Sequence, residues 1–287
     1  MQNTSIVTSS IPVSKGEILN YSISEKEFNS FRKLIYSRAG INLSPAKKSL
    51  VVSRLSKRLR HYNLETFSSY YELVTSEKQS EEMQVMVDLL TTNETYFFRE
   101  EKHFEFLQTE VLPNHKSGRR FRVWSAACSR GQEPYTLAMV LADQFDISGS
   151  WEIIATDISS KVLAHARQGS YPIDEASKIP EHMLSNYCLK GVRSHEGTLL
   201  VDKSLRQHID FRSLNLIDQW PDMGLFSVVF LRNVMIYFDV ETKRKLIDRI
   251  YHLLEPGGYL FIGHSESLNL VSKKFKLVRP SVYRREI

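Results

Sequence analysis

The chain has few cysteines, and none stands in a pattern that binds metal or builds a disulfide framework. Cys128 and Cys188 are the only two among 287 residues. Neither belongs to a C-x-x-C pair, so no structural zinc site is expected. No apolar run approaches the roughly 18 residues that cross a bilayer, and the first twenty residues lack the pattern of a signal peptide. We therefore expect a cytoplasmic protein without membrane insertion, with residues 1–19 as a flexible tail.

Negative charge is absent from one long stretch of the chain. Hydrophobic residues make up 42% and charged residues 25% of the sequence, which is ordinary for a soluble globular protein, and the net charge is +5. The stretch from Arg32 to Arg60, however, holds nine Lys and Arg residues and no Asp or Glu. Such a block indicates either an acidic partner, whether nucleic acid, membrane surface or protein, or a solvated helix face.

Helical signals fill residues 20–90. Ser24 and Glu27 have the spacing of a capping box, and apolar residues then recur at helical intervals until Gly40, which is typical of a helix end. Pro45 suits the first turn of a second helix. Two further helical patterns follow before the end of this region. The sequence therefore predicts a small all-α domain.

The second predicted helix, residues 46–61, is amphipathic. Its apolar residues lie on one side, whereas Arg54, Lys57 and Arg58 lie on or beside the opposite side. The helix therefore presents a basic surface that would suit an acidic partner.

From about residue 91 the pattern changes to strands that alternate with helices. Strands are predicted over 121–127, 151–157, 226–231 and 259–263, with a last extended segment over 275–284. Helices are predicted over 133–145, 159–167 and 240–254. This alternation is typical of crossover units and a mainly parallel sheet. The turn-rich stretch 169–209 breaks the rhythm, and we interpret it as a small insert in an α/β domain of residues 91–287.

Two carboxylates lie at the ends of consecutive predicted strands. In open parallel sheets, ligands bind beyond the carboxyl ends of the strands, where the first strand-to-helix turn approaches the cofactor. That turn, residues 126–134, contains Gly131 and Glu133 but lacks the G-x-G-x-x-G pattern of dinucleotide-binding proteins. Asp157 ends the next strand, the usual position of a carboxylate that binds ribose hydroxyls. Together these carboxylates favour a ligand with adenosine but no phosphate, and S-adenosylmethionine fits that description.

Two polar segments accompany these carboxylates. Residues 91–100 link the helical region to the α/β region and mix polar with aromatic side chains. We interpret at least two of the three aromatic residues 96–98 as interdomain core. Arg232 and Asn233 follow the strand predicted over 226–231. Both bring polar groups that need partners, so packing alone does not account for them.

Several short blocks follow one another in an order characteristic of one family. They are T-N-E-T-Y-F-F-R at 92–99, W-S-A-A-C at 124–128, E-P-Y at 133–135, R-N-V-M-I-Y-F at 232–238 and G-H-S-E-S at 263–267. With these blocks the chain resembles the CheR chemoreceptor glutamate methyltransferases from about residue 20 to its end.

The resemblance implies a fold and a reaction. The fold is a Rossmann-like S-adenosylmethionine methyltransferase domain of the α/β class with a small antiparallel β insert, preceded by a small all-α domain. The reaction transfers a methyl group to glutamate side chains on the cytoplasmic signalling helices of chemoreceptors. Its products are glutamyl methyl esters and S-adenosylhomocysteine, and it serves sensory adaptation.

The resemblance also implies the residues of the site. The cofactor would be bound by Asn93, Thr95, Arg99, Glu133, Asp157, Asn215, Leu216, Asn233 and Val234. Arg99 and Tyr237 would lie nearest the transferred methyl group, with Arg99 holding the acceptor carboxylate. Arg54, Lys57 and Arg58 would dock the acidic receptor helices. We expect a monomer that needs no metal and binds no nucleic acid.

The chain departs from the family pattern in two places. The turn that usually reads T-G-E-E-P is R-G-Q-E-P at 130–134, so Arg130 and Gln132 differ while Glu133 is retained. Arg130 adds a cation near the mouth of the expected site, where it can change partner preference. Leu231 replaces a cysteine that often precedes R-N-V, which is a packing change with little chemical meaning.

Other functions fit the sequence less well. The block at 263–267 nearly matches the nucleophile motif of serine hydrolases, but no histidine follows His264, as the hydrolase order requires. Neither H-E-x-x-H nor paired-histidine spacing supports metal catalysis. Two alternatives stay open. One is a methyltransferase of another acidic or nucleic-acid substrate, although Asn233 lacks the Pro-Pro-aromatic loop that base methylation uses. The other is a non-catalytic module that binds cofactor and docks receptors.

Overall fold

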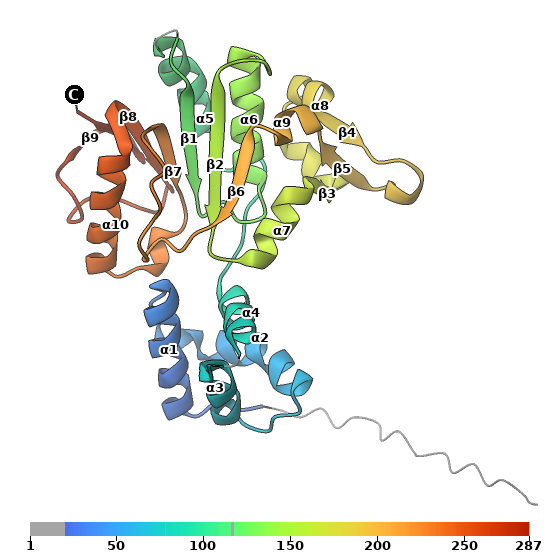
Figure 1. Cartoon of the computed structure of the whole chain (residues 1–287), viewed down its shortest axis with the longest axis vertical. Helices are drawn as coiled ribbons and strands as arrows, with labels where there is room; N and C mark the ends of the chain where they lie inside the picture. The colour runs from blue at the N-terminus through green and yellow to red at the C-terminus, as the bar shows by residue number, and fades with distance from the viewer. Residues whose placement is uncertain (1–20, 78, 116–117, 287) are drawn as a thin grey trace, which may run out of the picture.

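The computed structural model describes residues 21–77, 79–115 and 118–286, so the tail expected over residues 1–19 lies outside the described part. A helical domain meets an α/β domain at the edge where the strands of the main sheet end (Figure 1). None of the helices in the described part is both long and apolar enough to cross a membrane. The fold class predicted from the sequence is confirmed.

The helical domain contains the helices that the sequence predicted, with some ends shifted by about two residues. Its helices are α1 (Glu25–Ala39), α2 (Lys48–His61), α3 (Phe67–Thr75) and α4 (Ser80–Leu90), and a 3-10 turn (Pro45–Lys47) leads into α2. Ser24 and Glu27 form the expected capping box. Gly40 ends α1 with a φ of 70°, and a Cβ atom there would lie 2.8 Å from Cγ2 of Ile217 in the other domain. Glycine therefore permits both the helix end and the approach of the α/β domain.

One buried carboxylate joins three helices of this domain. Glu82 on α4 is only 2% exposed. Its oxygens accept hydrogen bonds from Arg58 (2.8 Å) and Tyr62 (3.0 Å), which lie on and just after α2, and from Tyr70 on α3 (2.6 Å). Burial alone would raise the pKa of Glu82, but the hydrogen bonds from Arg58 and the two tyrosines outweigh burial and lower that pKa. Arg58, which was expected on a docking surface, has its partner inside the domain.

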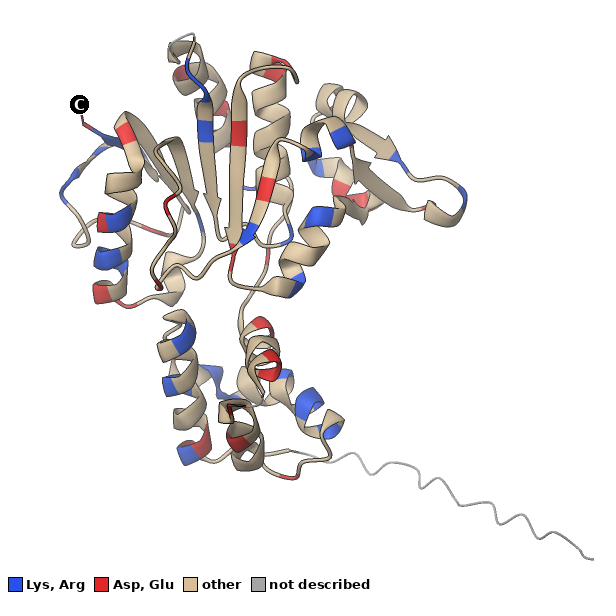
Figure 2. Cartoon of the chain, in the orientation of Figure 1, with Lys and Arg blue, Asp and Glu red and all other residues tan. Residues whose placement is uncertain are grey.

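Other cations of the basic stretch also have internal partners. Figure 2 shows Lys and Arg along α1 and α2. Lys48 pairs with Glu25 at 2.6 Å. Arg54 donates to the backbone carbonyls of Leu90 (3.1 Å) and Thr91 (2.8 Å). Lys57 is exposed, so of the three expected docking residues it alone lies fully at the surface.

The segment between the domains folds back onto the α/β domain. It leads into α5 (Lys102–Phe106), a π-helical turn (Leu107–Val111) and a 3-10 turn (Leu112–Asn114). Phe97 packs against Tyr171 with ring centroids 5.0 Å apart, and Phe98 packs against Phe104 at 5.6 Å. Both belong to the core of the α/β domain, so the interpretation as interdomain core was wrong, although both are buried. Tyr96 is exposed at 42%.

The main sheet is mostly parallel, as predicted. Its elements are β1 (Phe121–Ala126), α6 (Gln132–Phe145), β2 (Trp151–Asp157), α7 (Ser160–Gln168), β6 (Ile209–Ser213), β7 (Phe226–Leu231), α10 (Val240–Leu253), β8 (Leu254–Ile262), β9 (Phe275–Arg279) and β10 (Val282–Arg285). In the described part the strand order is β6-β2-β1-β7-β8-β10-β9. The first five strands run parallel, and β10 runs antiparallel to β8 and β9.

Three strand boundaries differ from the prediction. Strand β6 was not predicted: the insert was expected to end at about residue 209, and the residues that follow form an edge strand of the main sheet. Strand β8 begins at Leu254 rather than at the predicted residue 259. The glycine-containing turn signal around Gly257 lies within the strand, where the register with β7 shifts as in a bulge. The last extended segment is a hairpin of β9 and β10 rather than a single strand.

Helices cover both faces of the sheet. Val123 and Phe230 belong to a core cluster with side chains of α5, α6 and α7. Their chain neighbours Trp124 and Val229 belong to a second cluster with side chains of α10. Since successive side chains in a strand point to opposite faces, the two clusters lie on the two sides of the sheet.

The insert is a small antiparallel sheet with short helices, in agreement with the prediction. It consists of β3 (Ser170–Pro172), a 3-10 helix (Ile173–Lys178), α8 (Glu181–Tyr187), β4 (Cys188–Lys190), a 3-10 turn (Arg193–His195), β5 (Thr198–Val201) and α9 (Lys203–Arg206). The order β3-β5-β4 places β5 in the middle. The insert lies beside α6 and α7 and projects away from the main sheet (Figure 1).

We predict that Glu82→Ala destabilises the helical domain by about 3 kcal/mol, because it leaves the Arg58 guanidinium and the Tyr70 hydroxyl without their acceptor. Urea denaturation should show this loss, while Glu81→Ala, which removes an exposed neighbouring carboxylate, should leave stability nearly unchanged. Because the pKa of Glu82 is lowered on folding, its contribution is present above the ordinary carboxyl pKa of about 4.3 and lost as the pH falls through the lowered value. Equal stabilities of the two variants at neutral pH would contradict the role of Glu82.

Candidate active site

A cavity of about 420 Å³ lies beyond the carboxyl ends of β1, β2 and β7. The strand order reverses between β1 and β7, and the crevice at such a reversal is where open α/β sheets bind ligands. The helical domain supplies part of the wall through Ile41, Leu43 and Lys47. Sequence reasoning placed the site in the α/β domain alone and missed this contribution.

The cavity brings together the residues expected to bind cofactor. It is lined by Asn93, Thr95, Arg99, Glu133, Asp157, Asn215, Leu216, Asn233, Val234 and also by Tyr237. These residues come from the linker, α6 and the ends of three strands, so only the fold makes them neighbours. Arg54, Lys57 and Arg58 are not among the lining residues.

The backbone around the cavity is strained. Phe98, Glu100, Ala127, Ser129 and Asn233 all have positive φ values, between 51° and 70°. Non-glycine residues rarely adopt this conformation, and it tends to persist where function requires it. Strain in the linker, the turn after β1 and the turn after β7 thus surrounds one cavity.

Asp157 holds the turn after β1 in place. One carboxylate oxygen of Asp157 accepts the backbone N–H of Ser129 (2.8 Å), and the other accepts that of Ser159 (2.9 Å). Burial raises the pKa of Asp157, although these hydrogen bonds work in the opposite direction. A carboxylate has about four acceptor sites, so Asp157 can still bind ligand hydroxyls. The turn also needs Gly131, where a Cβ atom would lie 2.8 Å from the Tyr171 hydroxyl.

The two residues of the turn at 130–134 that depart from the family pattern point toward the insert. Gln132 donates from Nε2 to Oε2 of Glu175 at 2.9 Å, and Arg130 pairs with the other oxygen of Glu175 at 3.7 Å. Arg130 is absent from the lining of the cavity. Its charge is therefore directed at a carboxylate of the insert, rather than at the site mouth as the sequence suggested.

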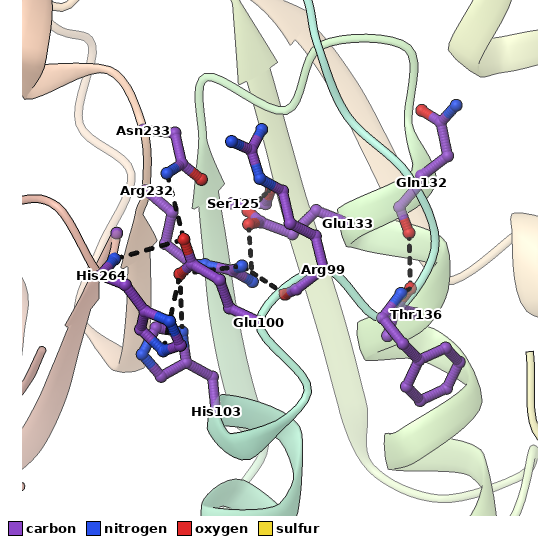
Figure 3. Close-up of polar contacts among 12 residues, drawn as sticks. Arg99, Glu100, His103, Ser125, Gln132, Glu133, Thr136, Arg232, Asn233 and His264 are labelled. Atoms are coloured by element: carbon purple, nitrogen blue, oxygen red, sulfur yellow. Dashed lines mark hydrogen bonds and ion pairs between the residues drawn. The ribbon is translucent and has the colours of Figure 1, made fainter. Parts of the chain in front are cut away.

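A buried arginine of the cavity lining connects three segments of the chain (Figure 3). The Arg232 side chain, just after β7, is only 2% exposed. It pairs with Glu100 of the linker at 3.2 Å and with Glu133 of α6 at 3.3 Å, and it donates to the backbone carbonyl of Arg99. Ser125 of β1 donates to Glu133 at 2.7 Å. These are the partners that the sequence required for a polar strand end.

The pKa values of the two carboxyl groups beside Arg232 are shifted in opposite directions. Burial raises the pKa of Glu133, even though Arg232 and Ser125 favour its ionised form. Burial would also raise the pKa of Glu100, but Arg232 and the hydrogen bond from Asn233 outweigh it and lower the pKa. Glu100 is thus the firmly ionised partner of the guanidinium.

A second carboxylate fixes the turn after β7. Glu266 accepts backbone N–H groups from Asn233 (2.9 Å) and Ile236 (3.1 Å), which flank the turn, and from Gly263 (2.7 Å). Burial raises the pKa of Glu266 despite these bonds. The tyrosine at the end of the turn, Tyr237, accepts the backbone N–H of Asn42 in the helical domain with its own carbonyl (2.8 Å). The turn thus also contacts the helical domain.

Arg99 lies at the side of the cavity. Its guanidinium donates to the backbone carbonyl of Glu94 and lies over the ring of Tyr96, 5.8 Å from the centroid. It is half-buried, as is Tyr237, so both expected catalytic side chains are accessible from the cavity.

Comparison with known proteins decides the family. The protein-family model described as "CheR methyltransferase, all-alpha domain" matches residues 26–91. A second family model, described as "CheR methyltransferase, SAM binding domain", matches residues 93–284. The chain belongs to the CheR methyltransferase family. It is therefore an S-adenosylmethionine-dependent methyltransferase of chemotaxis.

CheR relatives match this chain over nearly its full length. The chemotaxis protein methyltransferase of Escherichia coli (strain K12) is 40% identical over 284 residues, 96% of this chain and 98% of the relative. That of Borreliella burgdorferi is 35% identical over 277 residues, 93% and 96% of the two chains. Among solved structures, the glycopeptide N-methyltransferase MtfA complexed with S-adenosylmethionine is 16% identical with a TM-score of 0.35, covering 60% and 58% of the chains, a likeness too distant to support a conclusion.

Four residues at this CheR site were not identified from the sequence. Glu100, His103, His264 and Glu266 all contact the segments that carry the expected cofactor residues. Glu266 and His264 stood in a block that supported the family resemblance and was compared with hydrolase motifs, but neither residue was given a role at the site. The contacts join segments far apart in the chain, so spacing in the sequence gave no signal for them.

We predict that Glu266→Gln lowers stability by about 1–3 kcal/mol, because the amide NH₂ would face backbone donors that need an acceptor. Cofactor affinity should fall as well, since Asn233 and Val234 line the cavity from the released turn. Urea denaturation and calorimetric titration with S-adenosylmethionine measure the two effects. Glu105→Gln, an exposed change on α5, serves as the control. A Glu266→Gln variant that matched this control in both measurements would show that Glu266 does not hold the turn.

Proposed function

We propose that this CheR-family enzyme methylates glutamate side chains on the cytoplasmic signalling helices of chemoreceptors, forming glutamyl methyl esters and S-adenosylhomocysteine for sensory adaptation. The observation that supports it most is the convergence of Arg99, Tyr237 and the expected cofactor residues on one cavity. The names of the relatives, chemotaxis protein methyltransferases, agree with this class of acceptor. We further propose that the enzyme acts as a monomer in the cytoplasm.

The donor set of the cavity fits S-adenosylmethionine. Asp157 and Glu133 offer carboxylates that suit ribose hydroxyls and a positively charged amino-acid end. Among the described residues that line the cavity, no glycine-rich phosphate loop is found, which disfavours a nucleotide with phosphates. Asn93, Thr95, Asn215, Leu216, Asn233 and Val234 would complete the cofactor site.

The chemistry asks little acid–base work of the protein. When bound, S-adenosylmethionine supplies an electrophilic methyl group on a positively charged sulfur. A glutamate acceptor has an ordinary pKa of about 4.3, so it is already an anion at neutral pH and needs no general base. The enzyme must desolvate and align the acceptor oxygen. In our proposal Arg99 holds the acceptor carboxylate by a charge-assisted hydrogen bond, and Tyr237 orients it.

The basic surface of α2 is the proposed docking site for the acidic receptor helix. Of the residues first expected there, Arg54 and Arg58 are engaged with the linker carbonyls and Glu82. Lys57 and Arg60 lie three positions apart on α2 and are exposed, so they lie on the same helical face. We therefore propose Lys57 and Arg60 as the charges that meet the receptor.

Methylation of purified receptor cytoplasmic fragments with radiolabelled S-adenosylmethionine tests the proposed function. Label should enter the fragments and be released as volatile methanol by mild alkali, as expected for an ester but not for an N-methyl group. Replacing the target glutamates by alanine should abolish incorporation. Label that resists alkali, label on nucleic acid, or cofactor binding with no transfer to any fragment would each contradict the proposal.

For Arg99→Ala we predict a turnover roughly 10–100-fold lower at saturating cofactor, because the acceptor carboxylate loses a charge-assisted hydrogen bond. Cofactor affinity, measured by calorimetry, should change much less. Arg212→Ala, an exposed change on β6, should retain normal turnover. If Arg99→Ala instead loses cofactor binding while keeping normal turnover at saturation, Arg99 is a cofactor ligand only.

For the double variant Lys57→Glu and Arg60→Glu we predict a higher KM for receptor with unchanged cofactor affinity. Complementary charge mainly speeds association and weakens with salt, so the variant should also lose most of the salt dependence of the wild-type rate. The matched control is Lys273→Glu with Lys276→Glu, which makes the same change in net charge near β9. Receptor kinetics that respond equally to both double variants would show that α2 is not the docking surface.

A further inference from the structure

A cluster of two histidines and a carboxylate lies next to the buried Arg232 of the cavity lining. Glu100 lies in the linker just before α5, His103 lies in α5, and His264 follows β8 (Figure 3). Each offers a potential ligand atom, and these atoms all lie within 4.8 Å of one another. Imidazole and carboxylate are the ligands that zinc and similar divalent transition metals take in proteins.

His103 lacks the partners that a buried imidazole needs. Its side chain is only 2% exposed, and neither ring nitrogen has a hydrogen-bond partner among the described residues. A buried polar group left unsatisfied carries a desolvation penalty, so such groups call for an explanation. The ring packs edge-on against His264, with centroids 4.8 Å apart. The unpartnered His103 thus lies directly beside the two other potential ligands.

The distances within the cluster are close to those of a metal centre. Nδ1 of His103 lies 3.5 Å, and Nε2 of His264 4.0 Å, from the same oxygen of Glu100. In tetrahedral zinc sites the ligand atoms lie roughly 3.3 Å apart, given metal–ligand distances of about 2.0–2.1 Å. Most of the remaining adjustment falls to His264, whose side chain is 48% exposed in the turn after β8 and has room to move.

We propose that Glu100, His103 and His264 bind one divalent transition-metal ion of the zinc class, with water in the remaining position. The site lies beside the cofactor cavity, and the inference does not depend on the identity of the methyl acceptor. Nothing in the sequence spacing predicted it, because the third ligand comes from a distant segment.

The effect of metal binding on the cavity depends on Arg232, which neighbours the proposed ligands. Arg232 shares the Glu100 carboxylate, so a metal competes with the guanidinium for it. Arg232 retains Glu133 at 3.3 Å and the Arg99 carbonyl, which allows Glu100 to turn toward the metal without leaving the guanidinium unpaired. Glu100 also accepts a hydrogen bond from Asn233, at 3.2 Å, a residue of the cavity wall. The bound metal therefore loosens the cavity wall and inhibits methyl transfer reversibly.

The test is direct metal binding to the full chain without cofactor or receptor. Calorimetric titration with Zn²⁺ should show one site at micromolar concentration, and Co²⁺ should develop the visible absorption of a low-symmetry complex. Affinity should fall at least about tenfold in His264→Ala and in Glu100→Gln. His195→Ala, which removes an exposed histidine of the insert, is the matched control and should bind like wild type. Because His264 is exposed, its replacement should leave folding intact, which circular dichroism verifies.

Two results would overturn the proposal. One is the absence of a site filled below millimolar Zn²⁺, which would leave His103 as a buried imidazole satisfied by water at most. The other is equal affinity in wild type, His264→Ala and His195→Ala, which would place the metal elsewhere. Inhibition of methylation by Zn²⁺ and its reversal by chelator form a second readout. Failure of the receptor assay leaves the binding measurement unaffected, so the two proposals fail separately.

Discussion

The burial of one guanidinium constrains the whole carboxyl edge of the sheet. A buried charge that loses its partner lowers the stability of the fold by several kcal/mol, so Arg232 requires anionic partners from other segments of the chain. It finds Glu100 in the linker and Glu133 at the start of α6. The linker is thereby held against β7, and with it Arg99 and the strained residues around it. One ion-pair cluster thus positions segments that sequence distance would leave independent.

Two further carboxylates organise the remaining turns in the same way. Asp157 accepts backbone N–H groups of the turn after β1, and Glu266 accepts those of the turn after β7. In both, burial acts against ionisation and raises the pKa. Hydrogen bonds to backbone donors offset this burial in part and fix turns whose φ values are unfavourable. Carboxylates at this edge of the sheet therefore stabilise backbone turns as well as offering groups that can bind a ligand.

The sequence predicted the fold class correctly, because that class depends on local pattern, and the residues that the resemblance assigned to the cofactor site all line one cavity. Strand runs, the turn at Gly131 and the ends of β2 and β7 each carry their signal within a few residues. What failed depended on contacts distant in sequence. Phe97 and Phe98 pack within the core of the α/β domain. Strand β6 pairs with β2 in the main sheet, and Arg58 donates a hydrogen bond to Glu82. A cation on the polar side of a helix looks the same in sequence whether it meets solvent or a buried acid.

Because Ile41, Leu43 and Lys47 of the helical domain share the cavity with the α/β domain, any ligand that fills it also holds the two domains together. The free energy of binding adds to that of the domain interface by mass action, reaching about 2.7 kcal/mol when the ligand is present at 100 times its Kd. The orientation of α2, and of the surface that it presents, is then linked to the supply of methyl donor. A metabolite pool would in this way determine how rigidly the enzyme is assembled before any partner arrives.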